Sequence, residues 1–163
     1  MHVHIGIDQK NINIIVEHLN RILADDAVLY IKTLNYHWNV EGPNFDPLHL
    51  FFRRQYEDLF EIVDEVAERI RTLGGKPCAS MAEYLQLTRL QEDSVTDKKS
   101  EQEMLAQLLQ DHETVICHLR KDIMLIQDDY KDIGTANLLT DNLLEKHEKI
   151  AWMLRASCER QRA

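Results

Sequence analysis

Four side chains in the first half of the chain belong to types that bind divalent metal ions: His37, His49, Asp64 and Glu68. Asp64 and Glu68 are four residues apart, so in a helix they lie on one face, where two carboxylates can share a cation. Imidazole and carboxylate ligands together are typical of iron, manganese or zinc, and oxygen-rich sites with open positions suit redox-active iron. The alternative is a solvated acidic face, because carboxylates run throughout the surrounding EDLFEIVDEVAER.

The histidine pair and the carboxylate pair cannot meet if residues 49 to 64 form one helix. Asp64 follows His49 by 15 residues, which is about 22 Å at a rise of ~1.5 Å per residue. Metal–ligand bonds are only about 2 Å long. Two interpretations remain: the histidines are structural, or a second subunit completes the site. A two-fold axis between two copies would generate two identical sites.

The elements that position these residues are predicted from apolar residues recurring every three or four positions. The first long helix runs from about Asp8 to Trp38, and EGPN breaks it. The second has Asp46 as its predicted N-cap and Pro47 at its first position. Gly74 and Gly75 stop it.

In the second half of the chain, two capping boxes and a turn predict where the helices begin and end. Ser80 with Glu83 starts a short helix inside a connection over residues 76–97, and Ser100 with Glu103 starts the third long helix. The segment DDYKDIGT ends that helix, and Thr135 is the predicted cap of the fourth, which extends to about Glu159.

No strand pattern competes with these helices. Four long helices with one long connection in the middle predict an all-α, ferritin-like four-helix bundle with a short helix in the crossover between the second and third helices. The length of 163 residues suits a single domain over residues 1–163, with residues 1–8 as a flexible tail.

The charge balance argues against strong DNA binding. The chain carries 19 Lys and Arg against 28 Asp and Glu, a net charge of −9, and has no Lys-rich N-terminal segment. Binding to DNA without base readout depends on cations that neutralise phosphates. We therefore expect DNA binding to be weak or absent, whereas an acidic surface suits metal cations.

The sequence also predicts a cytoplasmic protein that does not enter a membrane. No apolar window is long enough to span a bilayer, and no basic region followed by an apolar run marks a signal peptide at the N-terminus. The three cysteines are odd in number and form no C-x-x-C, which fits a reducing compartment.

Ferritin-like proteins with a di-iron site inside one bundle use Glu-x-x-His on two helices, and here no Glu stands three residues before any His. The segments HWNVEGPNFDPLH and DEVAERIRTLGG instead closely resemble the signature of the Dps family, the DNA-binding proteins from starved cells, which are miniferritins. TANLLTDNLLEKHEKIAWMLRA is similar to the family's C-terminal segment.

The resemblance implies a hollow homo-oligomeric shell, a dodecamer, with ferroxidase sites at two-fold interfaces. Fe(II) is oxidised there, preferably by hydrogen peroxide, and stored as ferric mineral, which protects against oxidative stress. Asp64 and Glu68 are implied from one chain and His37 and His49 from its partner, with Glu68 bridging two metals. Trp38 is implied as a nearby redox-active aromatic, or as a packing side chain.

The chain departs from the family pattern at Arg53. Many relatives have an acidic residue one turn after the second histidine, which helps to hold a second iron; here a permanent cation would repel it. We therefore expect one good metal site and a second, weak one. A Dps-like cage with impaired ferroxidase activity that acts as a metal store is one alternative, and a nucleoid DNA-binding protein is another.

Two further sets of residues carry expectations. In the family, carboxylates line pores at three-fold axes, which implicates Asp128, Asp129, Asp132 and Asp141, although an acidic loop at a helix N-terminus explains them equally well. The histidines at 112, 118 and 147 lie on or beside apolar stripes, so we expect packing or surface roles for them.

Overall fold

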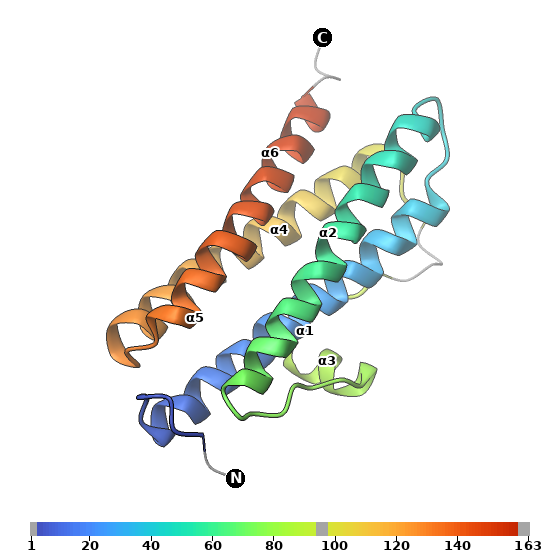
Figure 1. Cartoon of the computed structure of the whole chain (residues 1–163). Helices are drawn as coiled ribbons and strands as arrows, with labels where there is room; N and C mark the ends of the chain where they lie inside the picture. The colour runs from blue at the N-terminus through green and yellow to red at the C-terminus, as the bar shows by residue number, and fades with distance from the viewer. Residues whose placement is uncertain (1–2, 94–97, 160–163) are drawn as a thin grey trace.

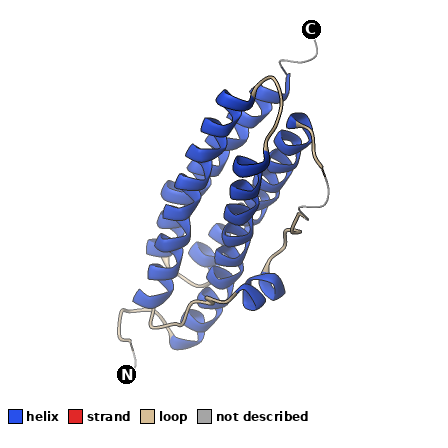
Figure 2. Ribbon diagram, turned by 90° about the vertical axis from the view of Figure 1, so that its right-hand side faces the viewer, coloured by secondary structure: helices blue, strands red, loops and turns tan. Residues whose placement is uncertain are grey.

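The computed structural model describes residues 3–93 and 98–159, and within these ranges every regular element is a helix. Helix α1 (Gln9–Asn39) packs antiparallel to α2 (Phe45–Thr72), and α4 (Glu101–Met124) lies beside α6 (Glu145–Glu159), as Figure 1 shows. The short helix α3 (Met81–Leu87) packs on α1, and the crossover that carries it runs along the side of the bundle (Figure 2). The predicted all-α, ferritin-like bundle is confirmed.

The third and fourth arms of the bundle, which are the third and fourth long helices predicted from the sequence, are less regular than the periodicity indicates. A π-helical segment, η1 (Leu125–Asp129), follows α4. The fourth arm consists of α5 (Ile133–Leu138), the π-helical segment η2 (Leu139–Leu144) and α6. Each π turn accommodates an extra residue in the helix, so both arms keep their apolar stripes on the core.

Three predicted helix starts are confirmed by their caps. The Asp8 side chain accepts a hydrogen bond from the Lys10 amide at the start of α1. Ser80 with Glu83 and Ser100 with Glu103 both form complete capping boxes, at α3 and α4. The predicted flexible tail at residues 1–8 falls partly outside the described residues and stays a prediction.

The predicted start of α2 is wrong by two residues. Asn44 is the N-cap, and Pro47 occupies the third helical position, where its missing N–H is still harmless. Glu101, at the start of α4, accepts from the Asn44 backbone N–H at 2.9 Å and from its side-chain amide at 2.8 Å. A carboxylate from another helix therefore caps α2, and it also sits so close to Gly42 that a Cβ there would lie 2.6 Å from it.

The predicted cap of the fourth arm is also wrong, because Asp132 rather than Thr135 is the N-cap of α5. The Thr135 amide donates to Asp132 Oδ1 at 3.0 Å. Arg69 of α2 donates to both carboxylate oxygens of Asp132 at 3.1 Å. Asp132 is thus a buried structural carboxylate, and of the four pore candidates only Asp128, Asp129 and Asp141 are exposed.

The core contains the predicted apolar stripes and a set of buried polar groups. Residues Leu139, Leu143, Ile150 and Leu154 of the fourth arm are all buried, as are Ile12, Ile15, Leu19, Ile22 and Leu23 of α1. Between them, His112 and His147 are fully buried and joined through their Nδ1 atoms at 2.9 Å, while Asp26 Oδ1 lies 3.2 Å from His147 Nε2. The expected packing role of these two histidines is confirmed.

We predict that His112 makes the fold sensitive to acid. Burial, and secondarily the neighbouring His147, lowers the pKa of His112 well below 6.5. Below pH ~6.5 the unfolded chain therefore binds a proton at His112, whereas the folded chain does not. The free energy of unfolding consequently falls as the pH drops from 6.5 toward the folded pKa, by up to about 1.4 kcal/mol per pH unit.

Urea unfolding of the wild type and of His112→Gln between pH 7 and 5 measures this contribution. Burial raises the pKa of Asp26, so protonation of Asp26 stabilises the fold on acidification and opposes the effect of His112. The contribution of His112 is therefore the difference between the pH dependence of the wild type and that of the variant. The wild type is expected to lose more stability than the variant on acidification. If the free energy of unfolding changed with pH by the same amount in both proteins, His112 would not contribute to the acid sensitivity.

None of the helices in the described ranges is long and apolar enough to cross a membrane.

Candidate metal centre

His37 and His49 form a reciprocal pair at the turn that joins α1 to α2. The Nδ1 atom of His37 lies 2.7 Å from the carbonyl oxygen of His49, and the Nδ1 atom of His49 lies 2.8 Å from the carbonyl oxygen of His37. The two rings stack with centroids 3.8 Å apart and planes inclined by 22°. His37 is buried and His49 is half-buried.

These two hydrogen bonds define which ring nitrogen can bind a metal. A carbonyl oxygen only accepts, so each Nδ1 carries the proton and each Nε2 keeps its lone pair. A metal-binding histidine typically has this arrangement, with its second nitrogen donating to a carbonyl or carboxylate. The pair is thus suited to donate two nitrogen ligands to a divalent ion.

Asp64 and Glu68 lie one turn apart on an exposed face of α2. Neither carboxylate has a hydrogen bond or ion pair with any other described residue, whereas their acidic neighbours are paired. Glu57 accepts from Arg53 at 2.8 Å, and Lys146 lies 3.3 Å from Glu61 and 3.9 Å from Glu65. The two predicted ligands are therefore carboxylates that no cation of the described chain neutralises.

The structure keeps the two pairs apart. Residues 49 and 64 belong to the same continuous helix α2, so their separation is the ~22 Å that the helical rise gives. In the described part of the chain, no group of three or more His, Cys, Asp or Glu side chains could hold a metal ion. One copy of the chain offers two half-sets of ligands rather than one site.

Arg53 is held along α2 by Glu57. Its Nε donates to Glu57 Oε1 at 2.8 Å, and both side chains are more than half exposed. This hydrogen bond, with a smaller contribution from the charge of Glu57 and of Tyr56, raises the pKa of the Arg53 guanidinium. A permanent cation consequently stands one turn after His49.

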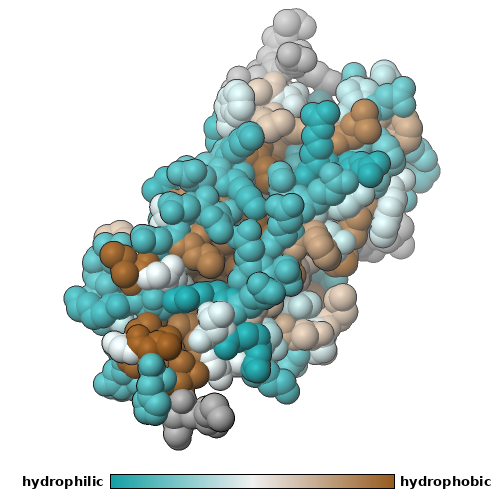
Figure 3. Space-filling model, in the orientation of Figure 1, coloured by the Kyte–Doolittle hydropathy of each residue, from teal (hydrophilic) through white to brown (hydrophobic). Residues whose placement is uncertain are grey.

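Large apolar side chains on α1 and α2 are exposed near both half-sets. Trp38 is 67% and Phe60 62% exposed, and Ile31 is also exposed. On the face drawn in Figure 3, hydrophobic side chains form separate patches among hydrophilic ones. Exposed aromatic side chains of this size are typical of surfaces that another protein covers.

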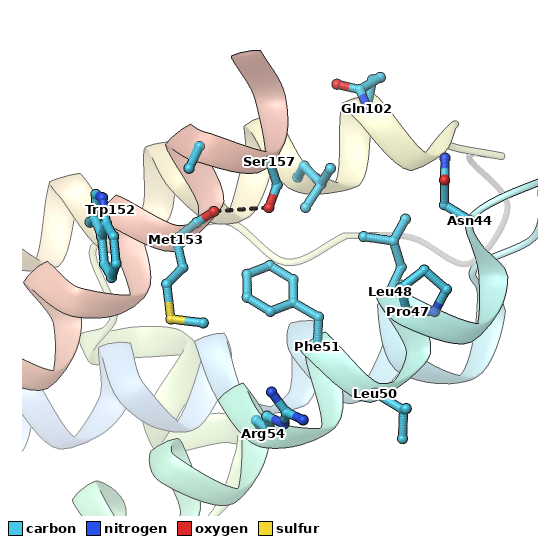
Figure 4. Close-up of a pocket in the computed structure, with 12 residues that line it drawn as sticks. Asn44, Pro47, Leu48, Leu50, Phe51, Arg54, Gln102, Trp152, Met153 and Ser157 are labelled. Carbon is cyan, nitrogen blue, oxygen red and sulfur yellow. Dashed lines mark hydrogen bonds between the residues drawn. The ribbon is translucent and has the colours of Figure 1, made fainter. Parts of the chain in front are cut away.

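The cleft of about 710 Å³ between α2, α4 and α6 is a different feature (Figure 4). Phe51 and Met153 face one another across it, and Arg54 lies at its edge. Its lining contains no Asp, Glu, His or Cys: Asn44, Pro47, Leu48, Leu50, Phe51, Arg54, Gln102, Leu105, Trp152, Met153, Ala156 and Ser157. It therefore offers no ligand set for a metal ion.

Comparison with known proteins agrees with the fold and with the residue pattern. A model of the ferritin-like domain matches residues 16–163, which places the chain in the ferritin-like class. The chain is 38% identical to DNA protection during starvation protein 2 of Bacillus anthracis, over 87% of this chain and 94% of that protein. It belongs to the Dps family, as its sequence resemblance predicted.

Two further relatives extend the comparison. The chain is 45% identical to an uncharacterised low temperature-induced protein of Nostoc sp. (strain PCC 7120), over 98% of this chain and 88% of the relative. The crystal structure of a Dps protein from Vibrio cholerae O1 superposes with a TM-score of 0.90 at 32% identity, covering 97% of each chain. That protein is described as a member of a broad superfamily of ferritin-like diiron-carboxylate proteins.

Sequence reasoning missed two aromatic residues beside the histidines: Phe45, whose ring stacks on His49 with centroids 5.1 Å apart, and Tyr56. The Tyr56 ring lies edge-on to His37, with centroids 5.2 Å apart and planes at 69°. Tyr56 is seven residues after His49, which is two helical turns, so helical periodicity places it on the same face. Trp38 follows His37 in sequence but makes no ring contact with it in the described structure.

Proposed function

We propose that this chain is an iron-oxidising and iron-storing miniferritin whose metal sites form between two copies. The observation that carries the proposal is that one chain holds two separate half-sets of metal ligands, each of which is incomplete alone. Two histidines keep their Nε2 lone pairs at one end of α2. Two carboxylates that have no partner among the described residues lie ~22 Å further along it. An antiparallel second copy brings the histidines of one chain to the carboxylates of the other.

Each residue has a distinct role in this site. His37 and His49 donate neutral nitrogen ligands, and Asp64 and Glu68 supply negative oxygen ligands that favour Fe(II) and stabilise the Fe(III) product. Glu68 is the bridging position. Apolar side chains such as Phe60 and Trp38 cover the surface where the copies meet and exclude water from around the ligands.

The reaction consumes two substrates, Fe(II) and hydrogen peroxide. Two Fe(II) ions give one electron each to one hydrogen peroxide molecule, its O–O bond breaks, and with two protons from solvent two water molecules and two ferric ions form, which removes both reagents of radical chemistry. The ferric product is stored as mineral in the hollow of a dodecameric shell, with Asp128, Asp129 and Asp141 as the proposed lining of the iron entry pores. The shell acts in the cytoplasm, and its net charge of −9 leaves DNA binding weak or absent.

Anaerobic mixing of the purified shell with Fe(II), followed by hydrogen peroxide or by air, tests the proposal. Ferric absorbance is expected to rise faster than in protein-free solution, and faster with peroxide than with air. A native mass measured on the same sample is expected to be that of a dodecamer. A ferric signal no faster than the protein-free rate, or a monomeric mass, would defeat the proposal.

A metal-storing cage with impaired oxidation is the second candidate, and Arg53 favours it. A cation one turn after His49 opposes the binding of a second divalent ion. In that case the shell binds Fe(II) at equilibrium but adds nothing to the rate of its oxidation. A gel-shift series in salt separates both candidates from a nucleoid protein, which would retain DNA at physiological ionic strength.

A further inference from the structure

Glu101, the first residue of α4, contacts the turn that carries the two proposed histidine ligands. Its Oε1 accepts from the Asn44 backbone N–H at 2.9 Å, and its Oε2 accepts from the Asn44 side-chain amide at 2.8 Å. The side chain is only 9% exposed, and it forms no ion pair with another described residue. Its negative charge lies instead at the N-terminal ends of two helices, α2 and α4, where the helix dipoles stabilise it.

The turn between α1 and α2 is shaped to admit this carboxylate. Gly42 has a φ of +138°, a conformation that residues with a Cβ rarely adopt, and a Cβ there would lie 2.6 Å from Glu101 Oε1. Phe45, the first residue of α2, follows Asn44 directly, and its ring stacks on His49 with planes inclined by 27°. The contact between Glu101 and Asn44 therefore fixes where α2 begins and how its first turn meets His49.

The reciprocal hydrogen bonds of the histidine pair join the two helix ends that this turn connects. His37 lies in the last turn of α1, where backbone carbonyls have no partner within the helix, so its oxygen is available to accept from His49 Nδ1 at 2.8 Å. His49 lies in the second turn of α2, and its carbonyl oxygen accepts from His37 Nδ1 at 2.7 Å. Both bonds form only while the end of α1 and the start of α2 keep one relative position.

We propose that Glu101 is a positioning residue for the metal ligands His37 and His49; this inference rests on the proposed function, in which their Nε2 atoms bind Fe(II). By holding Asn44, Glu101 maintains the two hydrogen bonds that keep each ring proton on Nδ1 and each Nε2 free. Loss of a hydrogen-bond partner of a metal-binding histidine typically weakens metal binding by roughly 10- to 100-fold. Because Glu101 acts one contact further from the rings, we expect the lower end of that range, about tenfold.

Ring tautomers and metal affinity of the assembled shell test this role. The tautomers are read in metal-free shells containing ¹⁵N-labelled histidine by solid-state nuclear magnetic resonance, with His37→Gln and His49→Gln shells to assign the two rings. Affinity is measured by anaerobic titration with Co(II), followed by its visible absorption. Wild type is expected to show both rings protonated at Nδ1. Glu101→Ala is expected to show a mixture of tautomers and to bind Co(II) about tenfold more weakly.

Glu103→Ala is the matched control, because Glu103 lies in the same turn of α4 and its carboxylate accepts from Ser100 at the start of that helix. This variant loses the same charge and a cap of α4 but no contact with α2, so wild-type tautomers and Co(II) affinity are expected. Glu101→Gln keeps the size of the side chain and one acceptor oxygen for the Asn44 backbone N–H. It is expected to assemble, also where Glu101→Ala does not, and to fall between wild type and Glu101→Ala in both measurements.

The outcomes separate the positioning role from the proposed function. Wild-type tautomers and Co(II) affinity in the Glu101 variants would overturn the inference. An equal loss in Glu103→Ala would also overturn it, because any weakening at the start of α4 would then have the same effect. A shell whose ring tautomers and Co(II) affinity depend on Glu101, but which oxidises no Fe(II), would overturn the proposed function and support the positioning role.

Discussion

An Asp64→Asn, Glu68→Gln double variant is expected to fold and assemble normally and to lose Fe(II) binding. Both side chains are exposed and have no partner among the described residues, so the free energy of unfolding should change by no more than about 0.5 kcal/mol. The change removes two negative oxygen ligands from each site. Losing even one ligand is expected to weaken binding at least tenfold, or about 1.4 kcal/mol. Anaerobic calorimetry with Fe(II), followed by the peroxide assay, measures both effects.

Glu61→Gln is the matched control for this variant. Glu61 lies on the same helix and is exposed, but its carboxylate is 3.3 Å from Lys146. Neutralising it changes the charge of α2 without removing a proposed ligand, so affinity and oxidation should stay at the wild-type level. Full Fe(II) occupancy in the double variant, or an equal loss in Glu61→Gln, would show that the acidic face acts only through its overall charge.

The sequence predicted those parts of the fold that depend on local contacts. Asp8, Ser80 and Ser100 cap helices through residues two or three positions away, and such spacings are visible in one sequence. The start of α2 was misplaced because Glu101, which is 57 residues from Asn44, completes its cap. The start of α5 was misplaced because Asp132 is held by Arg69 of another helix.

In the candidate site, too, the features that depend on residue type and spacing were predicted, and those that depend on tertiary contacts were not. Residue type and spacing identified His37, His49, Asp64 and Glu68, and helical rise alone separated them into two pairs. The reciprocal hydrogen bonds that leave Nε2 free could not be predicted, because they join each ring to the backbone of the other helix. The contact of Tyr56 with His37 depends likewise on how α1 packs against α2. Both properties arise from tertiary packing, which periodicity does not encode.

Complementation between two inactive variants is expected to restore activity, which tests whether the site lies between copies. Chains with His37→Ala and His49→Ala lack one half-set of ligands, and the Asp64→Asn, Glu68→Gln chains lack the other. Each variant alone should show no iron oxidation above the protein-free rate. A mixed dimer, however, has one of its two sites intact, with the histidines from one chain and the carboxylates from its partner.

The amount of restored activity follows from the symmetry of the pair. With equal expression and random pairing, about half of the dimers are mixed, and each of these keeps one of its two sites, so about a quarter of wild-type activity should return. Two affinity tags allow mixed shells to be purified, and the oxidation rate per chain is then measured against each parent. A site built within one chain would give no recovery at all, because every chain in the mixture lacks half of its ligands. Recovery near a quarter therefore separates an intersubunit site from an intrachain one without any knowledge of the metal geometry.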